Sequence, residues 1–281
     1  MIILAYMIAL VVSATAVALT QGRLRWQRRS FALSEKMQAA CRLFSIKFYD
    51  PVEIEDLPLP VKRYFETALR EGQAMIAIVR FTQQGTFRQN EKKDNWQPFQ
   101  ATQFVTTHPP GFEWDARIRM APGIYVWVRD AYVLGAGSLR AALLGLITVA
   151  DLRDTAALAS GELMRYLAEA VWYPTALLPS QGVLWQSIDE TSARATLSDG
   201  TTTVSLDFRF GADGLIAEVW SKSRSRTATE SAPWLCRLGT YEQRFGMSIP
   251  LLGEVEWELP AGPAPYFKGR LTNIDYEFVS Q

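Results

Sequence analysis

Four polar side chains near the middle of the chain have the spacing of one helix face. Glu162, Arg165, Tyr166 and Glu169 occupy positions i, i+3, i+4 and i+7, which an α-helix places side by side. Such a face either is solvated or turns into the protein, where each charge needs a partner because an unpaired buried charge is costly. In the second case the face can bind a ligand, so we take these four residues and Trp172 as candidates.

A strand predicted over residues 112–120 offers partners for that helix face. Its residues alternate between apolar and polar types, which predicts one buried and one polar side. Asp115 and Arg117 lie on the polar side, and we expect them to meet Arg165 and Glu169. The complete set of candidate ligand-binding residues is Glu162, Arg165, Tyr166, Glu169, Trp172, Asp115 and Arg117.

The sequence lacks the common catalytic and metal-binding patterns. Two carboxylates could act as general acid and base, but the spacing of Glu162, Glu169, Asp115 and Asp130 selects no pair. A single histidine, His108, argues against a histidine-based metal site and against a Ser-His-Asp triad. No phosphate-binding loop, dinucleotide fingerprint, nucleophile elbow or zinc spacing occurs. We therefore predict no catalytic residue, no metal and no cofactor.

The composition is that of a folded domain that does not bind nucleic acid. Of the 281 residues, 48% are hydrophobic and 12% aromatic, which is enough to bury a core. Basic and acidic residues number 29 each, but four arginines lie within residues 23–29, so the remainder has 25 basic against 29 acidic residues. An acidic remainder argues against nucleic acid as a partner. Cys41 and Cys236 lie in no CxxC motif and can pair only if the fold brings them together.

The chain begins with an uncharged apolar stretch from Met1 to Gly22. It is long enough to cross a bilayer as one helix. No basic residue precedes it and arginines follow it directly, which favours an uncleaved anchor, although Ala16-Val17-Ala18 has the form of a cleavage site. The positive-inside rule then places the domain in the cytoplasm, with a periplasmic or extracellular location as the alternative.

Behind this stretch the hydrophobic period changes several times. Residues 30–48 and 61–70 have helical spacing, and residues 50–60 have the composition of a linker. Residues 135–175 are predicted as a helical insertion, with helices over 138–149 and 152–172. Alternation and turn residues predict strands over 74–83, 99–107, 112–120, 124–134, 183–188, 193–197, 201–210, 215–221, 239–245, 254–259 and 269–278.

Together these elements predict an α+β fold preceded by one transmembrane helix. Asp199-Gly200 and Asp213-Gly214 are hairpin turns between strand-like runs, which indicates an antiparallel meander. We expect its sheet to curve like half a barrel, with the helix pair packed on one face. The expected division is an anchor at 1–22, a basic juxtamembrane segment and linker at 23–56, and a β-rich domain at 57–281.

The sequence also resembles a known family. The most specific string is Arg165-Tyr166-Leu167-Ala168-Glu169 followed by Trp172 and Pro174-Thr175-Ala176-Leu177-Leu178. Shorter matching pieces are Leu59-Pro60-Val61-Lys62-Arg63-Tyr64, Gly85-Thr86-Phe87-Arg88, Trp96-Gln97-Pro98-Phe99-Gln100-Ala101 and Ile249-Pro250. Over residues 57–278 they resemble an uncharacterised bacterial domain-of-unknown-function family, which implies no activity and no catalytic residue. In expected shape the domain is similar to lipoprotein-carrier half-barrels, which hold lipid-like ligands.

Three functions remain open from the sequence. The leading hypothesis is non-catalytic binding of a lipid or other apolar molecule near the bilayer, because an anchor precedes an aromatic-rich sheet. The second is an enzyme that uses the face of Glu162, Arg165 and Glu169, and it requires a concave site with these side chains inside. The third is a structural or partner-binding domain of an envelope complex, for which a large flat apolar patch would be expected.

Overall fold

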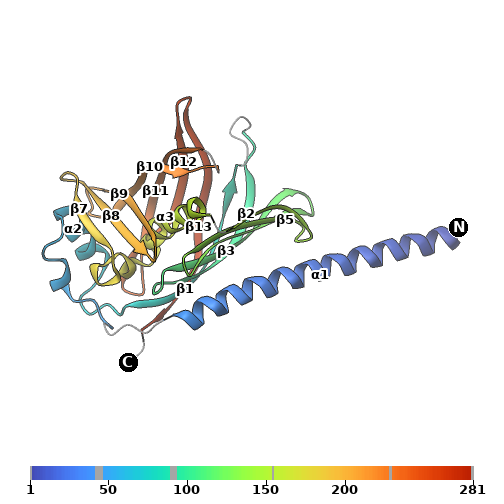
Figure 1. The fold of residues 1–281 in the computed structure, drawn as a ribbon, viewed down its shortest axis with the longest axis horizontal. Coiled ribbons are helices and arrows are strands. Elements are labelled where there is room, and N and C mark those ends of the chain that lie inside the picture. The colour runs from blue at the N-terminus through green and yellow to red at the C-terminus, as the bar shows by residue number, and fades with distance from the viewer. Residues whose placement is uncertain (1, 42–46, 89–93, 154, 228–229, 280–281) are drawn as a thin grey trace.

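The domain is built on one curved antiparallel sheet of thirteen strands (Figure 1). The computed structural model describes residues 2–41, 47–88, 94–153, 155–227 and 230–279. Strand order is β6-β5-β4-β3-β2-β1-β13-β12-β11-β10-β9-β8-β7, so two meanders meet where the first strand pairs with the last. The strands are β1 (Ile76–Phe87), β2 (Gln97–Thr106), β3 (Gly111–Ala121), β4 (Ile124–Val133), β5 (Ala136–Leu143), β6 (Ile147–Arg153), β7 (Leu184–Ser187), β8 (Ser192–Asp199), β9 (Thr202–Phe210), β10 (Ile216–Ser225), β11 (Ser231–Arg244), β12 (Met247–Leu259) and β13 (Gly262–Phe278).

Sequence features explain several of these elements. In β3 the side chains of Phe112, Trp114, Ala116 and Ile118 are buried in the core, as the alternation predicts, whereas Met120 near the end of the strand is exposed. Both expected hairpin turns occur, and Gly200 and Gly214 have positive φ angles of 56° and 80° that a side chain disfavours. The short helix α2 (Leu59–Ala68) has Pro60 in its first turn, where the missing N–H costs nothing. The predicted α+β class and the curved antiparallel sheet are therefore confirmed.

One helix crosses the concave side of the sheet. Helix α3 (Ala156–Glu169) begins at Thr155, whose side chain accepts a hydrogen bond from the Leu158 N–H at 3.1 Å. The short 3-10 turns η2 (Ala170–Trp172), η3 (Pro174–Leu177) and η4 (Pro179–Gln181) follow it. This segment links the two edge strands β6 and β7, and the sheet wraps around it in Figure 1. It packs on both meanders, chiefly on β5 and β9.

The predicted helix over residues 138–149 is wrong. Those residues lie in β5, in β6 and in the turn between them, so the described residues of the insertion contain one α-helix and not a pair. The run is apolar without a gap, and its alanines and leucines favour a helix. Pairing of β5 with β4 and of β6 with β5 overrides that preference.

Helix α1 (Ile2–Ala40) is continuous through the predicted anchor and beyond it. It is long and apolar enough to cross a membrane, and its first part protrudes from the domain (Figure 1). Its second part lies on the outer side of the sheet, where Trp26 and Met37 are buried. The helix predicted over residues 30–48 is thus the end of α1 as far as Ala40, and residues 42–46 lie outside the described part.

Candidate functional site

Arg165 is the centre of a buried polar cluster between α3 and the sheet. Its Nη1 donates to Asp130 Oδ2 on β4 at 2.7 Å, and its Nε donates to Glu169 Oε1 one helical turn away at 2.7 Å. Gln103 on β2 donates to the second Glu169 oxygen at 2.6 Å and accepts from Arg165 Nη2 at 3.4 Å. Burial alone would lower the pKa of the guanidinium, but the carboxylates of Glu169, Asp130 and Glu162 raise it above its usual value.

Glu162 and Asp130 form a carboxyl pair beside this cluster. Glu162 is 5% exposed, and two oxygens are left without a donor: Glu162 Oε2 and Asp130 Oδ1. Burial, followed by the charge of Asp130 and a hydrogen bond with it, raises the pKa of Glu162 well above its usual value, although Arg224 and Arg165 oppose the shift. A proton held by Glu162 and donated to Asp130 satisfies both oxygens, so we assign the neutral form to Glu162.

Arg224 on β10 completes the cluster. Its Nη2 donates to the Gly161 carbonyl of α3 at 3.1 Å, and its guanidinium lies over the ring of Trp234 at 5.0 Å. The cluster thus contains two guanidinium groups, two ionised carboxylates and the neutral Glu162. Its charges sum to zero, so no uncompensated charge is buried.

Substituting Glu162 tests this protonation. A folded-state pKa above the unfolded one means that the folded chain binds more protons, so its stability is full below about pH 4.5 and is lost as pH rises toward the folded pKa. Glu162→Gln keeps a donor for Asp130 and cannot ionise. We expect its free energy of unfolding, measured by denaturant titration between pH 5 and 9, to fall less with pH than that of the wild type.

The matched control for this measurement is Glu190→Gln, which changes an exposed carboxylate in the turn between β7 and β8. It should keep the wild-type pH dependence. Equal slopes for the wild type and Glu162→Gln would show that Glu162 is ionised in the folded protein, and the assignment of the shared proton would be wrong.

Tyr166 and Trp172 lie in the same core but serve to hold the backbone. The Tyr166 hydroxyl donates to the Thr107 carbonyl at 3.4 Å, and the Tyr166 carbonyl accepts from Tyr173 at 2.8 Å. Trp172 Nε1 donates to the Pro250 carbonyl at 2.8 Å. Both side chains therefore connect α3 and its 3-10 extension to the sheet. The side chain of Tyr166 is 2% exposed and that of Trp172 is 5% exposed.

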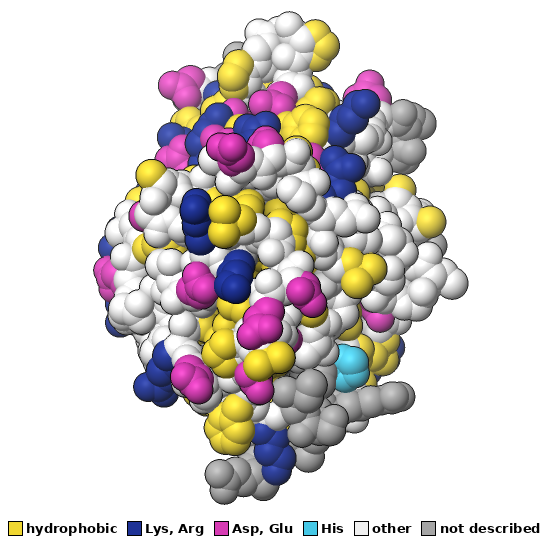
Figure 2. Space-filling view, turned by 90° about the vertical axis from the view of Figure 1, so that its left-hand side faces the viewer, with side chains coloured by type: hydrophobic (Ala, Val, Ile, Leu, Met, Phe, Trp, Pro, Cys, Tyr) yellow, Lys and Arg dark blue, Asp and Glu magenta, His cyan; other side chains and the backbone are white. Residues whose placement is uncertain are grey.

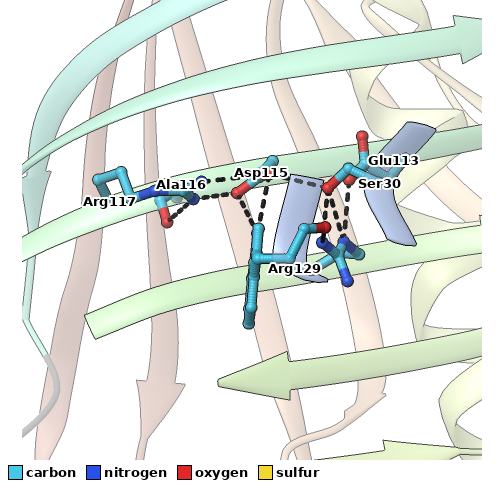
Figure 3. Close-up of polar contacts among 7 residues, drawn as sticks. Ser30, Glu113, Asp115, Ala116, Arg117 and Arg129 are labelled. Atoms are coloured by element: carbon cyan, nitrogen blue, oxygen red, sulfur yellow. Dashed lines mark hydrogen bonds and ion pairs between the residues drawn. The ribbon is translucent and has the colours of Figure 1, made fainter. Parts of the chain in front are cut away.

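Asp115 and Arg117 do not join the α3 cluster, contrary to the expected pairing with Arg165 and Glu169. On β3 they point to the outer face, where both Asp115 oxygens accept from Trp26 Nε1 of α1 at 3.0 and 2.9 Å. Ser30 of α1 also donates to Asp115 at 2.9 Å, and Arg117 forms an ion pair with it (Figure 3). The alternation of β3 was predicted correctly, but its polar side faces α1.

Arg129 on β4 fastens α1 at the same place. Its Nη2 donates to the Trp26 carbonyl at 2.7 Å, and its Nε donates to Glu113 at 3.1 Å, with both side chains about 5% exposed. Its guanidinium also lies over the Trp26 ring at 4.3 Å, and Figure 3 shows it beside Ser30. Burial, then the charge of Asp115, raises the pKa of Glu113, while the charge and the hydrogen bond of Arg129 oppose the rise.

The sequence of residues 55–276 matches the model of a family of unknown function, DUF6920. The chain belongs to this family. The expected resemblance to a domain of unknown function is therefore confirmed. No curated protein matches the chain. Among solved structures, a LolA superfamily protein from Nitrosomonas europaea is similar at 10% identity and a TM-score of 0.31, covering 78% of this chain and 92% of that one. A beta-barrel-like protein of unknown function (DUF1849) from Brucella abortus is similar at 12% identity and a TM-score of 0.18, covering 72% and 99%.

Two surface hollows of the described part of this DUF6920 domain lie outside α3, and the second of them is lined by Gln103 of the cluster. Within the described ranges, one hollow lies near Gly211 and Tyr241, and a second of about 400 Å³ lies between α1 and the outer side of β1, β2 and β13. Neither is lined by a residue of α3. The described residues also contain no group of three or more His, Cys, Asp or Glu side chains that could hold a metal ion.

Sequence reasoning missed Gln103 and Arg224 as members of the buried cluster. Gln103 is a polar residue at an inward position of β2, which alternation could have shown. Arg224 lies in a run of serines and basic residues just after the strand predicted over 215–221, and nothing local distinguishes it. Cys41 and Cys236 are both free, so no disulfide joins them.

Proposed function

We propose that this chain is a single-pass membrane-anchored domain that binds a lipid or similar apolar chain without catalysing a reaction. The observation that carries the proposal is the concave face of the sheet, which is rich in aromatic side chains and is covered by α3. Besides its charged centre, this helix packs on the face with Leu163 and Leu167, apolar side chains whose contacts an acyl chain could replace. A ligand with apolar chains can therefore compete with α3 for the face.

The anchor is supported by α1. No residue in the most hydrophobic 18-residue window of this helix is buried, so the domain does not cover its apolar stretch. Such a surface is stable in lipid and not in water. The arginines within residues 23–29 favour the cytoplasmic side for the domain.

An apolar path continues from the covered face to solvent. Phe99 on β2 contacts both Trp114, which lies under Arg165, and Phe267 on β13. Phe87 and Tyr266 meet edge to face at 6.0 Å, and both are partly exposed, as is Phe267. An acyl chain could enter along these rings and replace apolar contacts of α3 with its own, so that little apolar surface is exposed in the exchange.

A non-catalytic role agrees with the state of the carboxylates. Glu162 has the raised pKa that a general acid needs, but neither of the two hollows named above is lined by it. A partner-binding role would need a large apolar patch. Figure 2 shows the face carrying α2 and β7, where apolar side chains occur in small groups between charged and polar ones.

Photocrosslinking tests the proposed ligand. The full chain is reconstituted in nanodiscs that contain a phospholipid with a diazirine in its acyl chain, and the labelled peptides are mapped after proteolysis. We expect labelling of inward residues of β1 and β13 in addition to α1. Phe87→Arg places a charge at the open end of the path and should abolish labelling of the concave face.

Val52→Arg is the matched control, because Val52 is 66% exposed in the 3-10 turn η1 (Pro51–Ile54), which contributes no residue to this path. It should leave the labelling unchanged. Labelling confined to α1 in the wild type would overturn the proposal that the concave face binds lipid.

A further inference from the structure

We propose that the turn between β5 and β6, together with the turn between β3 and β4, inserts into the headgroup region of the bilayer beside α1. We name the four residues concerned the bilayer tip: Ile124, Leu146, Ile147 and Val149. The inference rests on the proposed anchoring and adds to it that the domain lies against the membrane in one fixed orientation.

The bilayer tip exposes large aliphatic side chains at one end of the sheet. Ile147 and Val149 are 64% and 60% exposed, and Ile124 and Leu146 are 43% and 40% exposed. The two turns are adjacent, because the Leu144 N–H donates to the Tyr125 carbonyl at 2.8 Å. Such a cluster at the tip of a sheet is unfavourable in water and fits an apolar environment.

The depth of the bilayer tip follows from its contact with α1. A Cβ atom built on Gly22 would lie 2.4 Å from Leu146 Cδ2, so the turn touches the helix at Gly22. The uncharged stretch ends at this glycine and Arg23 is the first charge. Since an α-helix rises 1.5 Å per residue, Leu19 lies only about 4.5 Å further along the axis. The turn is therefore level with the boundary between the acyl chains and the headgroups.

The direction of β6 shows which end of it is close to the bilayer. Ile147 begins the strand near Gly22, and four residues later Asp151 lies near Arg29. A hydrogen bond from Arg153, together with the charges of Arg153, Arg140 and Arg29, lowers the pKa of Asp151. β6 and the part of α1 after Gly22 thus run away from the membrane side by side, and Ile147 is at the end of β6 that is closest to the bilayer.

The attachment of α1 makes this placement rigid. Trp26, one turn after Gly22, is held by Asp115 and Arg129 from two strands of the sheet. The exposed arginines of the first turns after Gly22, Arg23 and Arg25, lie at the depth of lipid phosphates and attract anionic headgroups. The bilayer tip would thus face the acyl chains while Arg23 and Arg25 face the phosphates, which is the arrangement expected of a protein surface at a bilayer interface.

Depth-dependent fluorescence quenching tests the inference on the full chain. Cys41→Ser and Cys236→Ala remove the two free cysteines, and the environment-sensitive dye NBD is attached to single cysteines at position 147, 188 or 11 in nanodiscs. Lipids with a nitroxide near the top of the acyl chain are the quencher. We expect quenching at Ile147→Cys and no quenching at Ile188→Cys, which is exposed by 46% at the turn after β7.

Val11→Cys in the apolar part of α1 distinguishes failure of the bilayer tip to insert from failure of α1 to anchor the chain. Quenching at position 11 with none at position 147 would overturn the bilayer tip and leave the anchor intact. No quenching at either position would overturn both. A blue-shifted emission at position 147 that persists in detergent, without quenching by nitroxide lipid, would mean that a second copy of the chain covers β6, which also overturns the inference.

Discussion

Replacing Arg165 with methionine is expected to lower the free energy of unfolding by about 3–5 kcal/mol, because it leaves buried carboxylates without their cation. Asp130 and Glu169 lose their hydrogen bonds of 2.7 Å to the guanidinium, and their side chains are only 12% and 14% exposed. The rings of Phe112 and Trp114, each 4.9 Å from the guanidinium, cannot solvate them. Denaturant titration of the full chain in detergent, followed by tryptophan emission, measures the loss.

The triple variant Arg165→Met, Asp130→Asn, Glu169→Gln is the control for volume and shape. It removes the cation and the two anions bonded to it, and the remaining Arg224 can be balanced by ionisation of Glu162, so we expect most of the stability to return. If Arg165→Met were as stable as the wild type, the cluster would be solvated. If the triple variant were as unstable as the single one, packing and not charge would explain the loss.

The second large effect is expected at Trp26, whose replacement with alanine should cost about 3–5 kcal/mol in the attachment of α1. The indole is 3% exposed, donates to Asp115, and lies edge to face with Trp127 at 5.8 Å. Removing it leaves a cavity and an unpaired carboxylate where the helix meets the sheet. The helix should then separate from the domain while the sheet stays folded.

Spin-label distances report this separation directly. Labels at position 36 in α1 and at position 188 at the far edge of the sheet should give a narrow distance distribution in the wild type and a broad one in Trp26→Ala. Leu24→Ala is the matched control, because Leu24 lies two residues away and is 46% exposed. Its effect should stay within about 0.5 kcal/mol. A narrow distribution in Trp26→Ala would show that other contacts hold α1.

Much of this fold could be predicted because its patterns are local. The apolar stretch of α1, the alternation of β3 and the Asp-Gly hairpins each depend on a few adjacent residues. The segment of β5 and β6 could not be predicted in this way, since its apolar run has no period. Its turn also places Leu144 and Gly145 at φ angles of 53° and 71°, and a leucine there gives no warning of a turn.

The candidate site was predicted in part for a related reason. The spacing of Glu162, Arg165 and Glu169 is a property of one helix, so their shared face could be derived. Their partners lie on distant strands, and choosing Asp130 over Asp115 requires knowing which side of the sheet α3 covers. The spacing of Gly22, Trp26, Ser30 and Met37 on α1 indicates a helix face that packs on the sheet, but the arginines between them equally fit a helix that lies at a lipid surface.

The pairing of β1 with β13 has a consequence for how the chain is made. Each meander can form from strands that are neighbours in sequence. The two meanders join into one sheet only when β1 pairs with β13, which places Thr82 beside Asn273. A contact of such long range is slow to form. If α1 is inserted first, the ribosome synthesises the domain while it is already tethered to the membrane, and β1 keeps an open edge until the last strand emerges. Attachment of α1 to β3 and β4 during that interval would shield one half of the nascent sheet from other chains.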